Sequence, residues 1–413
     1  MTRAHRSPGS EVRWLLASAG LVASAAWSGG AAAASPHITK GPYLTGLDDD
    51  SVEVRFELDG PAAATVEVSA EGAPGAPRVV ADASAAMHDV HVGGLEAGKA
   101  YTYDVRVAGG PPSAPGRFLT APPKDAEGTV TFLVSGDNRG GDEVHATLTK
   151  MMLETPSDFV VNTGDVVADG GNLAEWGEFF RVEGTLLRDR PIFLCIGNHE
   201  LYDDQAGANF ARYFGYPDAS GALQPYGTMR WGNVRIFFLN GMHDWKSGTE
   251  RAWLEKALAD ADQEQGLVWR FVVVHHSPWA SGPHGGNAKL VEGRVPELLA
   301  AHGVDLLFGG HDHIYERGAA QLKYVVSGGG GAKLYDVAHR LPTTRKAESA
   351  YHFLAVTTSQ SSVKLVARRV DGSLLDQCGF EKGKPWDCDA PLPASPPPSA
   401  ASPQDPPDAH PPS

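Results

Sequence analysis

The sequence has 413 residues, of which 42% are hydrophobic, and its formal net charge is -15. This length is enough for two packed domains, and the composition excludes a fibrous or wholly disordered chain. The negative charge argues against nucleic acid as the main partner, because proteins that bind it usually present a basic face. A phosphate-bearing small molecule is not excluded, since bound metal ions supply positive charge that the sequence count omits.

Residues 1–35 have the composition of a secretory signal peptide. Arg3, Arg6 and Arg13 precede the apolar run WLLASAGLVASAAW, and small residues follow as far as Ser35. The run is shorter than the ~20 apolar residues that a membrane span needs. We therefore expect cleavage near Ser35, no membrane span in the mature chain, and a secreted or periplasmic protein.

The cysteine pattern agrees with export. Cys378 and Cys388 flank the short segment GFEKGKPWD, and a disulfide between them would staple this loop. Cys195 lies alone in the apolar segment PIFLCIG. A reactive thiol is the alternative, but a lone cysteine in an apolar strand is usually a small core residue.

Residues 36–121 are predicted to form a small all-β domain. In SVEVRFEL, alternate positions place Val52, Val54 and Phe56 on one face, and later segments repeat this alternation at a spacing typical of a sandwich. The segment APPKDAEG has the composition of a linker. At the other end, residues 389–413 are proline-rich and of low complexity, which predicts a semi-extended disordered tail.

From Val130 onward, short apolar runs alternate with segments of helical length. The predicted strands are TVTFLV, DFVVN, PIFLCI, VRIFFLN, WRFVVV and VDLLF. The predicted helices are EVHATLTKMMLE, NLAEWGEFFRVEGTLL, TERAWLEKALADAD and AKLVEGRVPELLAAH. Strands and helices in series predict a layered α/β core, in which ligands gather where the strands end.

Five of these predicted strands are followed by side chains that can bind a metal or transfer a proton. They are Asp137, Asp165, Asn198 with His199, His275 with His276, and His311 with His313. One such motif alone is more often a turn or a surface pair, but their coincidence favours a site. Oxygen and nitrogen donors without thiolates, including two aspartates and several histidines, indicate two metal ions. Gly309 and Gly310, which precede His311, permit tight turns and a close approach of the backbone.

The ordered motifs GD, GD, GNHE, HxP and GHxH resemble those of the calcineurin-like metallophosphoesterases, and GHDHIYER is close to the purple acid phosphatase form. GLEAGKAYTYDV and GRFLTAP resemble the fibronectin type III-like domain that precedes the catalytic domain in those phosphatases. The resemblance covers about residues 36–372. It implies an N-terminal all-β sandwich over 36–121 and a four-layer α/β metallophosphoesterase domain over 128–375, with two central β-sheets flanked by helices.

The resemblance also implies roles for the site residues. Asp165 would bridge two ions, with Asp137 and His313 on the first and Asn198, His276 and His311 on the second. His276 is preferred to His275 because HSP matches the family's His-x-Pro pattern, which leaves His275 a supporting role. His199 would be the outer-sphere acid that protonates the leaving oxygen, or it would donate a hydrogen bond to the phosphate, and His284 would contact the substrate.

Two positions depart from the family pattern. Arg139 stands where many relatives have a metal-binding histidine, and Ala168 stands where purple members have a tyrosine. The first ion therefore lacks an expected ligand, and the alternatives are water, Asp169 or weak occupancy. The missing tyrosine predicts a protein that is not purple. Arg139 is predicted to bind the substrate phosphate through two hydrogen bonds, the alternative being a surface arginine.

The sequence thus predicts an exported metal-dependent phosphoesterase that hydrolyses phosphate monoesters through a metal-bridging hydroxide. Its cofactors would be two ions of Fe, Zn or Mn, and its partner a small-molecule phosphate ester. A phosphodiesterase that uses the same two-metal site is the first alternative. A catalytically impaired binding protein is the second, because a first-site ligand is missing.

Overall fold

The computed structural model describes residues 35–72 and 75–389 of the chain. Apart from Ser35 and Asp389, the predicted signal peptide and proline-rich tail lie outside these ranges. Among the residues described, no helix is both long and apolar enough to cross a membrane.

The N-terminal part is an antiparallel sheet of five strands. They are β1 (Ile38–Thr45), β2 (Ser51–Ala70), β3 (Arg78–Gly93), β4 (Ala100–Val107) and β5 (Gly116–Leu119). The first half of β2 pairs with β1 and the second half with β4, while β3 pairs with β2 across both halves. Val52, Val54 and Phe56 are fully buried, as their alternation predicts. The all-β character is confirmed, and the likeness to a fibronectin type III sandwich stays a prediction.

Two further sheets follow, and they contain all six strands predicted after Val130. The six-stranded sheet has the order β20-β19-β18-β6-β7-β8, with β6 (Val130–Ser135), β7 (Phe159–Asn162), β8 (Ile192–Leu194), β18 (His352–Thr358), β19 (Ser362–Arg369) and β20 (Leu374–Glu381). The seven-stranded sheet has the order β11-β12-β13-β14-β16-β15-β17, with β11 (Gly227–Trp231), β12 (Val234–Leu239), β13 (Trp269–His276), β14 (Leu306–Gly310), β15 (Tyr315–Ala319), β16 (Lys323–Ser327) and β17 (Thr344–Glu348). A two-stranded sheet pairs β9 (Tyr216–Pro217) with β10 (Leu223–Gln224).

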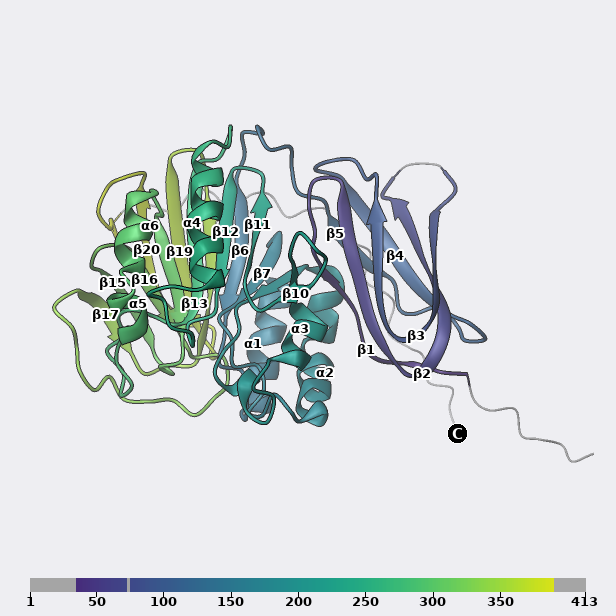
Figure 1. The fold of residues 1–413 in the computed structure, drawn as a ribbon, viewed down its shortest axis with the longest axis horizontal. Coiled ribbons are helices and arrows are strands. Elements are labelled where there is room, and N and C mark those ends of the chain that lie inside the picture. Colours follow the sequence, from purple (N-terminus) through teal and green to yellow (C-terminus); the bar gives the residue numbers. More distant parts are fainter. Residues whose placement is uncertain (1–34, 73–74, 390–413) are drawn as a thin grey trace, which may run out of the picture. The chain divides into compact units, whose positions relative to one another are not determined.

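The two large sheets face each other, and helices cover their outer sides (Figure 1). Because alternate side chains of a strand point to opposite faces, Phe132 packs between the sheets on Phe271 and Phe308, with ring centroids 5.8 and 6.0 Å away. Its neighbour Leu133 packs instead in the cluster formed with helices α1 and α2. The helices are α1 (Asp142–Glu154), α2 (Leu173–Asp189), η1 (His199–Leu201, a 3₁₀ helix), α3 (Ala208–Phe214), α4 (Thr249–Asp262), α5 (Ala288–Glu292) and α6 (Val295–Ala301). This is the predicted arrangement of two central sheets flanked by helices.

The predicted single helix AKLVEGRVPELLAAH is wrong, because the structure divides it into α5 and α6. Arg294 between them has a left-handed backbone, with φ of +55°. Pro296 lies in the first turn of α6, where its missing N–H is tolerated although it would break a continuous helix. Gly293 lies against Trp245, where a Cβ atom would approach the tryptophan to 2.6 Å.

The cysteines have the predicted states. Cys378 and Cys388 form a disulfide at the end of β20. Cys195 is a free thiol with no exposed surface, and burial raises its pKa well above the usual range. A buried thiol of raised pKa is a poor nucleophile, which agrees with a packing role.

Glu250, at the start of α4, makes stability depend on pH. Its carboxyl is buried and accepts one hydrogen bond, from the Asn240 backbone at 2.7 Å, and burial raises its pKa to about 8. Because the folded pKa exceeds the ordinary 4.5, the contribution of Glu250 to stability is full below pH 4.5 and is lost as the pH rises through 8.

Replacing Glu250 by glutamine removes this titrating group. We expect the difference in unfolding free energy between Glu250→Gln and wild type to be about 2–4 kcal/mol larger at pH 8.5 than at pH 5, in favour of the variant. Denaturant unfolding at the two pH values measures this difference, and Glu255→Gln, at an exposed position of the same helix, is the control. An equal difference at both pH values would contradict the assignment.

Candidate metal centre

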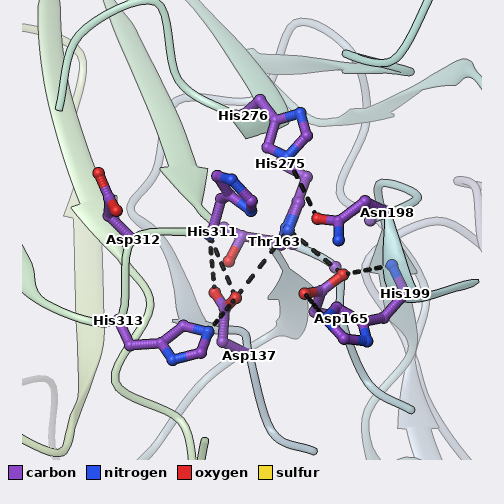
Figure 2. Close-up of polar contacts among 12 residues, drawn as sticks. Asp137, Thr163, Asp165, Asn198, His199, His275, His276, His311, Asp312 and His313 are labelled. Carbon is purple, nitrogen blue, oxygen red and sulfur yellow. Dashed lines mark hydrogen bonds and ion pairs between the residues drawn. The ribbon is translucent and has the colours of Figure 1, made fainter. Parts of the chain in front are cut away.

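The carboxyl ends of β6, β7, β8, β13 and β14 meet at one place, and the predicted ligands extend from them (Figure 2). Within the described residues, possible ligand atoms of His275, His276 and His311 lie within 4.8 Å of one another, and so do those of Asp137, Asp165 and His275. The predicted ligands Asn198 and His313 join these two clusters through contacts with His276 and Asp137 respectively. The structure therefore brings all six predicted ligands together.

The backbone at this site is strained. Asp137, Asp165 and His311 are left-handed, with φ of +56°, +57° and +69°, a conformation that costs about 1–3 kcal/mol for a residue other than glycine. Neighbouring glycines provide room, because a Cβ atom on Gly310 would lie 2.4 Å from Asp137 Oδ2 and one on Gly197 would lie 2.2 Å from Asp165 Oδ1. Strain at three strand ends that meet at one place is typical of a functional site.

Two carboxylates, Asp137 and Asp165, lie at the centre and have no exposed surface. Asp165 Oδ1 accepts a hydrogen bond from the backbone N–H of His199 at 3.0 Å, and Asp137 accepts one from the backbone N–H of His311 at 3.1 Å. Burial alone would raise the pKa of Asp165, but the neighbouring His275 and His199 hold it well below its usual range. Asp165 therefore stays ionised.

One half of the site is formed by Asn198, His276 and His311. Asn198 Oδ1 lies 3.1 Å from His276 Nε2, and the rings of His276 and His311 have centroids 3.7 Å apart. Burial, followed by the neighbouring His275, lowers the pKa of His276 to about 3 and also lowers that of His311. Both imidazoles are therefore neutral at physiological pH and can bind a cation.

The other half contains Asp137, His313 and Arg139. His313 donates its Nδ1 hydrogen to the Lys333 carbonyl at 2.7 Å, which turns Nε2 towards Asp137 Oδ1 at 3.4 Å. Arg139 reaches the same place, with Nε 3.3 Å from Asp165 Oδ2 and Nη2 3.4 Å from His313 Nε2. Its side chain is 19% exposed, so it belongs to the site and not to the outer surface.

His275, which the sequence assigned a supporting role, lies directly against both carboxylates. Its Nδ1 is 2.7 Å from the Thr163 carbonyl, and its Nε2 is 3.3 Å from Asp165 Oδ1 and 4.0 Å from Asp137 Oδ1. Nε2 is buried and has no aligned hydrogen-bond partner. Burial lowers the pKa of His275, but the two carboxylates outweigh it and raise the pKa to about 9.

The two histidines predicted to act on the substrate, His199 and His284, lie at the rim. His199 has Nδ1 2.6 Å from the Ala168 carbonyl and Nε2 3.8 Å from Asp165 Oδ2, and burial lowers its pKa. His284 has Nδ1 2.9 Å from Asp312 Oδ1, and its ring centroid is 4.4 Å from that of His311. The side chain of His284 is 44% exposed, so it can reach a molecule in solvent.

The sequence did not identify Glu200 as part of the site. This buried carboxylate accepts hydrogen bonds from the N–H groups of Asp165 at 2.9 Å, Gly197 at 2.6 Å and Val166 at 2.8 Å. Burial, with the negative Asp165 nearby, raises its pKa to about 7. The sequence did contain a signal for Glu200, because it is the last residue of the GNHE motif. A buried acidic side chain among such tight turns needs hydrogen-bond donors around it.

Three further residues complete the surroundings. Asp312 orients His284, and its place between two histidines in GHDH was the available signal. Tyr335 stacks on His313, with centroids 4.1 Å apart and an interplanar angle of 11°, but it belongs to no motif. Asp169, the alternative ligand, accepts a hydrogen bond from Gly171 N at 2.9 Å, as expected of a turn residue.

This donor set fits two divalent cations. Carboxylate, amide and imidazole groups are suitable ligands for Fe, Zn or Mn, and the two clusters of ligand atoms offer a place for each ion. His275 Nε2 faces both carboxylates and makes no aligned hydrogen bond.

Comparison with known proteins agrees with this geometry. Residues 130–315 match the calcineurin-like phosphoesterase family. The chain is 28% identical over 246 residues to probable purple acid phosphatase 20 of Arabidopsis thaliana. This alignment covers 57% of this chain and 56% of the relative. It is 26% identical over 297 residues to purple acid phosphatase 3 of the same plant, covering 61% and 78% of the two chains. It thus spans little more than half the length of the first relative.

Solved structures show the same fold. Purple acid phosphatase PPD1 from seeds of yellow lupin (Lupinus luteus) superposes with a TM-score of 0.70 at 18% identity, covering 84% of this chain and 74% of that one. A structure of PhoD superposes with a TM-score of 0.66 at 13% identity, covering 84% and 91%. Residues 130–315 thus match the calcineurin-like phosphoesterase family in sequence, and the solved structures show that the fold is shared. The relatives named above are purple acid phosphatases, which supports a phosphatase-type hydrolase.

Glu200 is expected to control metal affinity without touching a metal. In Glu200→Gln, an amide N–H would face backbone N–H groups and displace the loop that carries Asp165. Loss of such a supporting contact typically weakens metal binding by about 10- to 100-fold. Titration calorimetry with Zn²⁺ measures the change.

The matched control is Glu183→Gln, because Glu183 is equally buried but pairs with His145 in the helix layer. We expect wild-type metal affinity in this variant. Equal weakening in the two variants would show that Glu200 acts only through general stability.

Proposed function

We propose that this protein is an exported, two-metal phosphatase that hydrolyses phosphate monoesters. The observation that carries the proposal is the convergence of two buried carboxylates with neutral imidazoles and Asn198, next to the partly exposed Arg139, His199 and His284. Export is supported by the composition of residues 1–35 and by the disulfide Cys378–Cys388.

Asp137 and His313 would hold the first ion, and Asn198, His276 and His311 the second, with Asp165 between them. When bound, two such ions lower the pKa of a shared water and neutralise charge on the phosphoryl oxygens. Ala168 provides no phenolate at the position where purple relatives have one, so we expect a protein that is not purple. Fe, Zn and Mn all suit these donors.

The side chains on the open side of the site would bind and protonate the substrate. Arg139 presents a planar guanidinium that suits two phosphate oxygens, and His284, oriented by Asp312, provides another polar contact. His199 donates its Nδ1 hydrogen to the Ala168 carbonyl, which fixes the ring and leaves Nε2 to hold the proton for the leaving oxygen.

Monoesters fit this charge distribution better than diesters. A monoester dianion carries one more negative charge than a diester, and the cationic Arg139 complements that charge. An impaired binding protein is disfavoured because all six predicted ligands converge in the structure.

Substrate preference follows from this proposal. The metal-loaded protein should hydrolyse p-nitrophenyl phosphate faster than bis-p-nitrophenyl phosphate, measured as kcat/KM. Chelation should abolish both activities, and added Zn²⁺, Mn²⁺ or Fe²⁺ should restore them. Faster hydrolysis of the diester would instead support the phosphodiesterase, and no hydrolysis with any metal would support the binding protein.

The role of His199 can be separated from metal binding. In His199→Asn, the amide N–H can still donate to the Ala168 carbonyl, but the group equivalent to Nε2 is removed. We expect kcat to fall by about 10²–10⁴ for an alkyl phosphate, whose leaving group needs a proton, with an unchanged metal content.

The loss should be much smaller for p-nitrophenyl phosphate, because nitrophenolate leaves without protonation. Steady-state kinetics on both substrates test this difference. Equal losses for the two esters would contradict the role of His199 as an acid.

A further inference from the structure

His275 has one nitrogen whose role the preceding account does not explain. The Thr163 carbonyl can only accept, so the hydrogen on Nδ1 must donate to it, at 2.7 Å. Nε2 is therefore the nitrogen that faces Asp165 and Asp137. It has no exposed surface and no aligned hydrogen bond, so it cannot reach substrate or solvent.

We propose that His275 Nε2 is a ligand of the first metal ion, in place of the ligands lost through Arg139 and Ala168. The inference rests on the proposed two-metal site. The proposal assigns metal binding to His275, which is not part of the His-x-Pro pattern that selects His276.

The distances suit a shared ion. Metal–nitrogen and metal–oxygen bonds are about 2.0–2.2 Å long, so two ligand atoms of one ion lie about 3–4 Å apart. Nε2 of His275 is 3.3 Å from Asp165 Oδ1 and 4.0 Å from Asp137 Oδ1. Nε2 of His313 is 3.4 Å from that same oxygen of Asp137. Asp137, Asp165 and His275 thus have ligand atoms within 4.8 Å of one another, and His313 adjoins this cluster through Asp137.

His275 and His313 are also oriented in the same way. Each donates its Nδ1 hydrogen to a backbone carbonyl at 2.7 Å, and each directs Nε2 at Asp137. A histidine that binds a metal through one ring nitrogen usually donates a hydrogen bond from the other, and this bond fixes the orientation of the ring. Arg139 does not compete for the same atom of Asp165, because it contacts Oδ2 and His275 faces Oδ1.

The alternative is that His275 is a permanent imidazolium, paired with the two carboxylates. His275→Asn distinguishes the two roles, because the asparagine amide can still donate to the Thr163 carbonyl while the group equivalent to Nε2 is removed. Elemental analysis after equilibration with Zn²⁺ should give about two ions per chain for wild type and about one for His275→Asn.

The control is His145→Gln, which changes another buried histidine and keeps a donor to Glu183 at the position of Nε2. It should bind two ions. Two ions in His275→Asn as well would overturn the proposal.

A second measurement needs no variant. In the Co²⁺-loaded wild type, a metal-bound His275 should give a hyperfine-shifted proton signal for Nδ1–H that exchanges slowly, because this hydrogen is buried against Thr163. Four histidine N–H signals from His275, His276, His311 and His313 support the proposal. Three signals overturn it, even if His275→Asn does not fold.

These results are separable from the proposed function. If the wild-type protein binds one ion per chain and still hydrolyses monoesters, the role of His275 is wrong but the proposed phosphatase activity is supported. A wild type that binds two ions but hydrolyses no phosphate ester would overturn the phosphatase, while the metal content of His275→Asn would still decide the role of His275.

Discussion

Two carboxylates with no exposed surface, Asp137 and Asp165, are the constraint on which the rest of this site depends. Buried charges of like sign are strongly unfavourable unless cations neutralise them. The structure surrounds them with groups that are positive or can bind a cation: His275 on the buried side, Arg139 on the open side and His313 beside Asp137. The proposed metal ions complete this neutralisation, and the same positive charge would attract a phosphate.

The fold delivers these groups through strand ends and strained turns. Parallel strands of two facing sheets end at one place, so residues far apart in the sequence meet there without long side chains. The left-handed backbone at Asp137, Asp165 and His311 turns the carboxylates and imidazole inward, and Glu200 ties the loop of Asp165 to that of Gly197 through backbone N–H groups. Packing in both sheets offsets the cost of this local strain.

Much of this arrangement could be predicted from the sequence, because apolar runs followed by polar motifs mark strand ends directly. The predicted ligands converge for that reason. Residues that act through other residues were harder to find: Glu200 serves backbone N–H groups, and Tyr335 approaches His313 only through the tertiary fold. The break between α5 and α6 depends on Arg294 in a left-handed conformation, which a helical pattern does not reveal. The pattern that singled out His276 gave His275 only a supporting role, although its Nε2 lies 3.3 Å from Asp165 Oδ1.

The central claim is that two cations lie on either side of Asp165. Crystals of the Zn²⁺-loaded protein, measured at the zinc absorption edge, would locate them directly by anomalous scattering. The account predicts two peaks, one near Asp137 and His313 and one near Asn198, His276 and His311. No peak within bonding distance of Asp165, in crystals that contain zinc elsewhere, would contradict it.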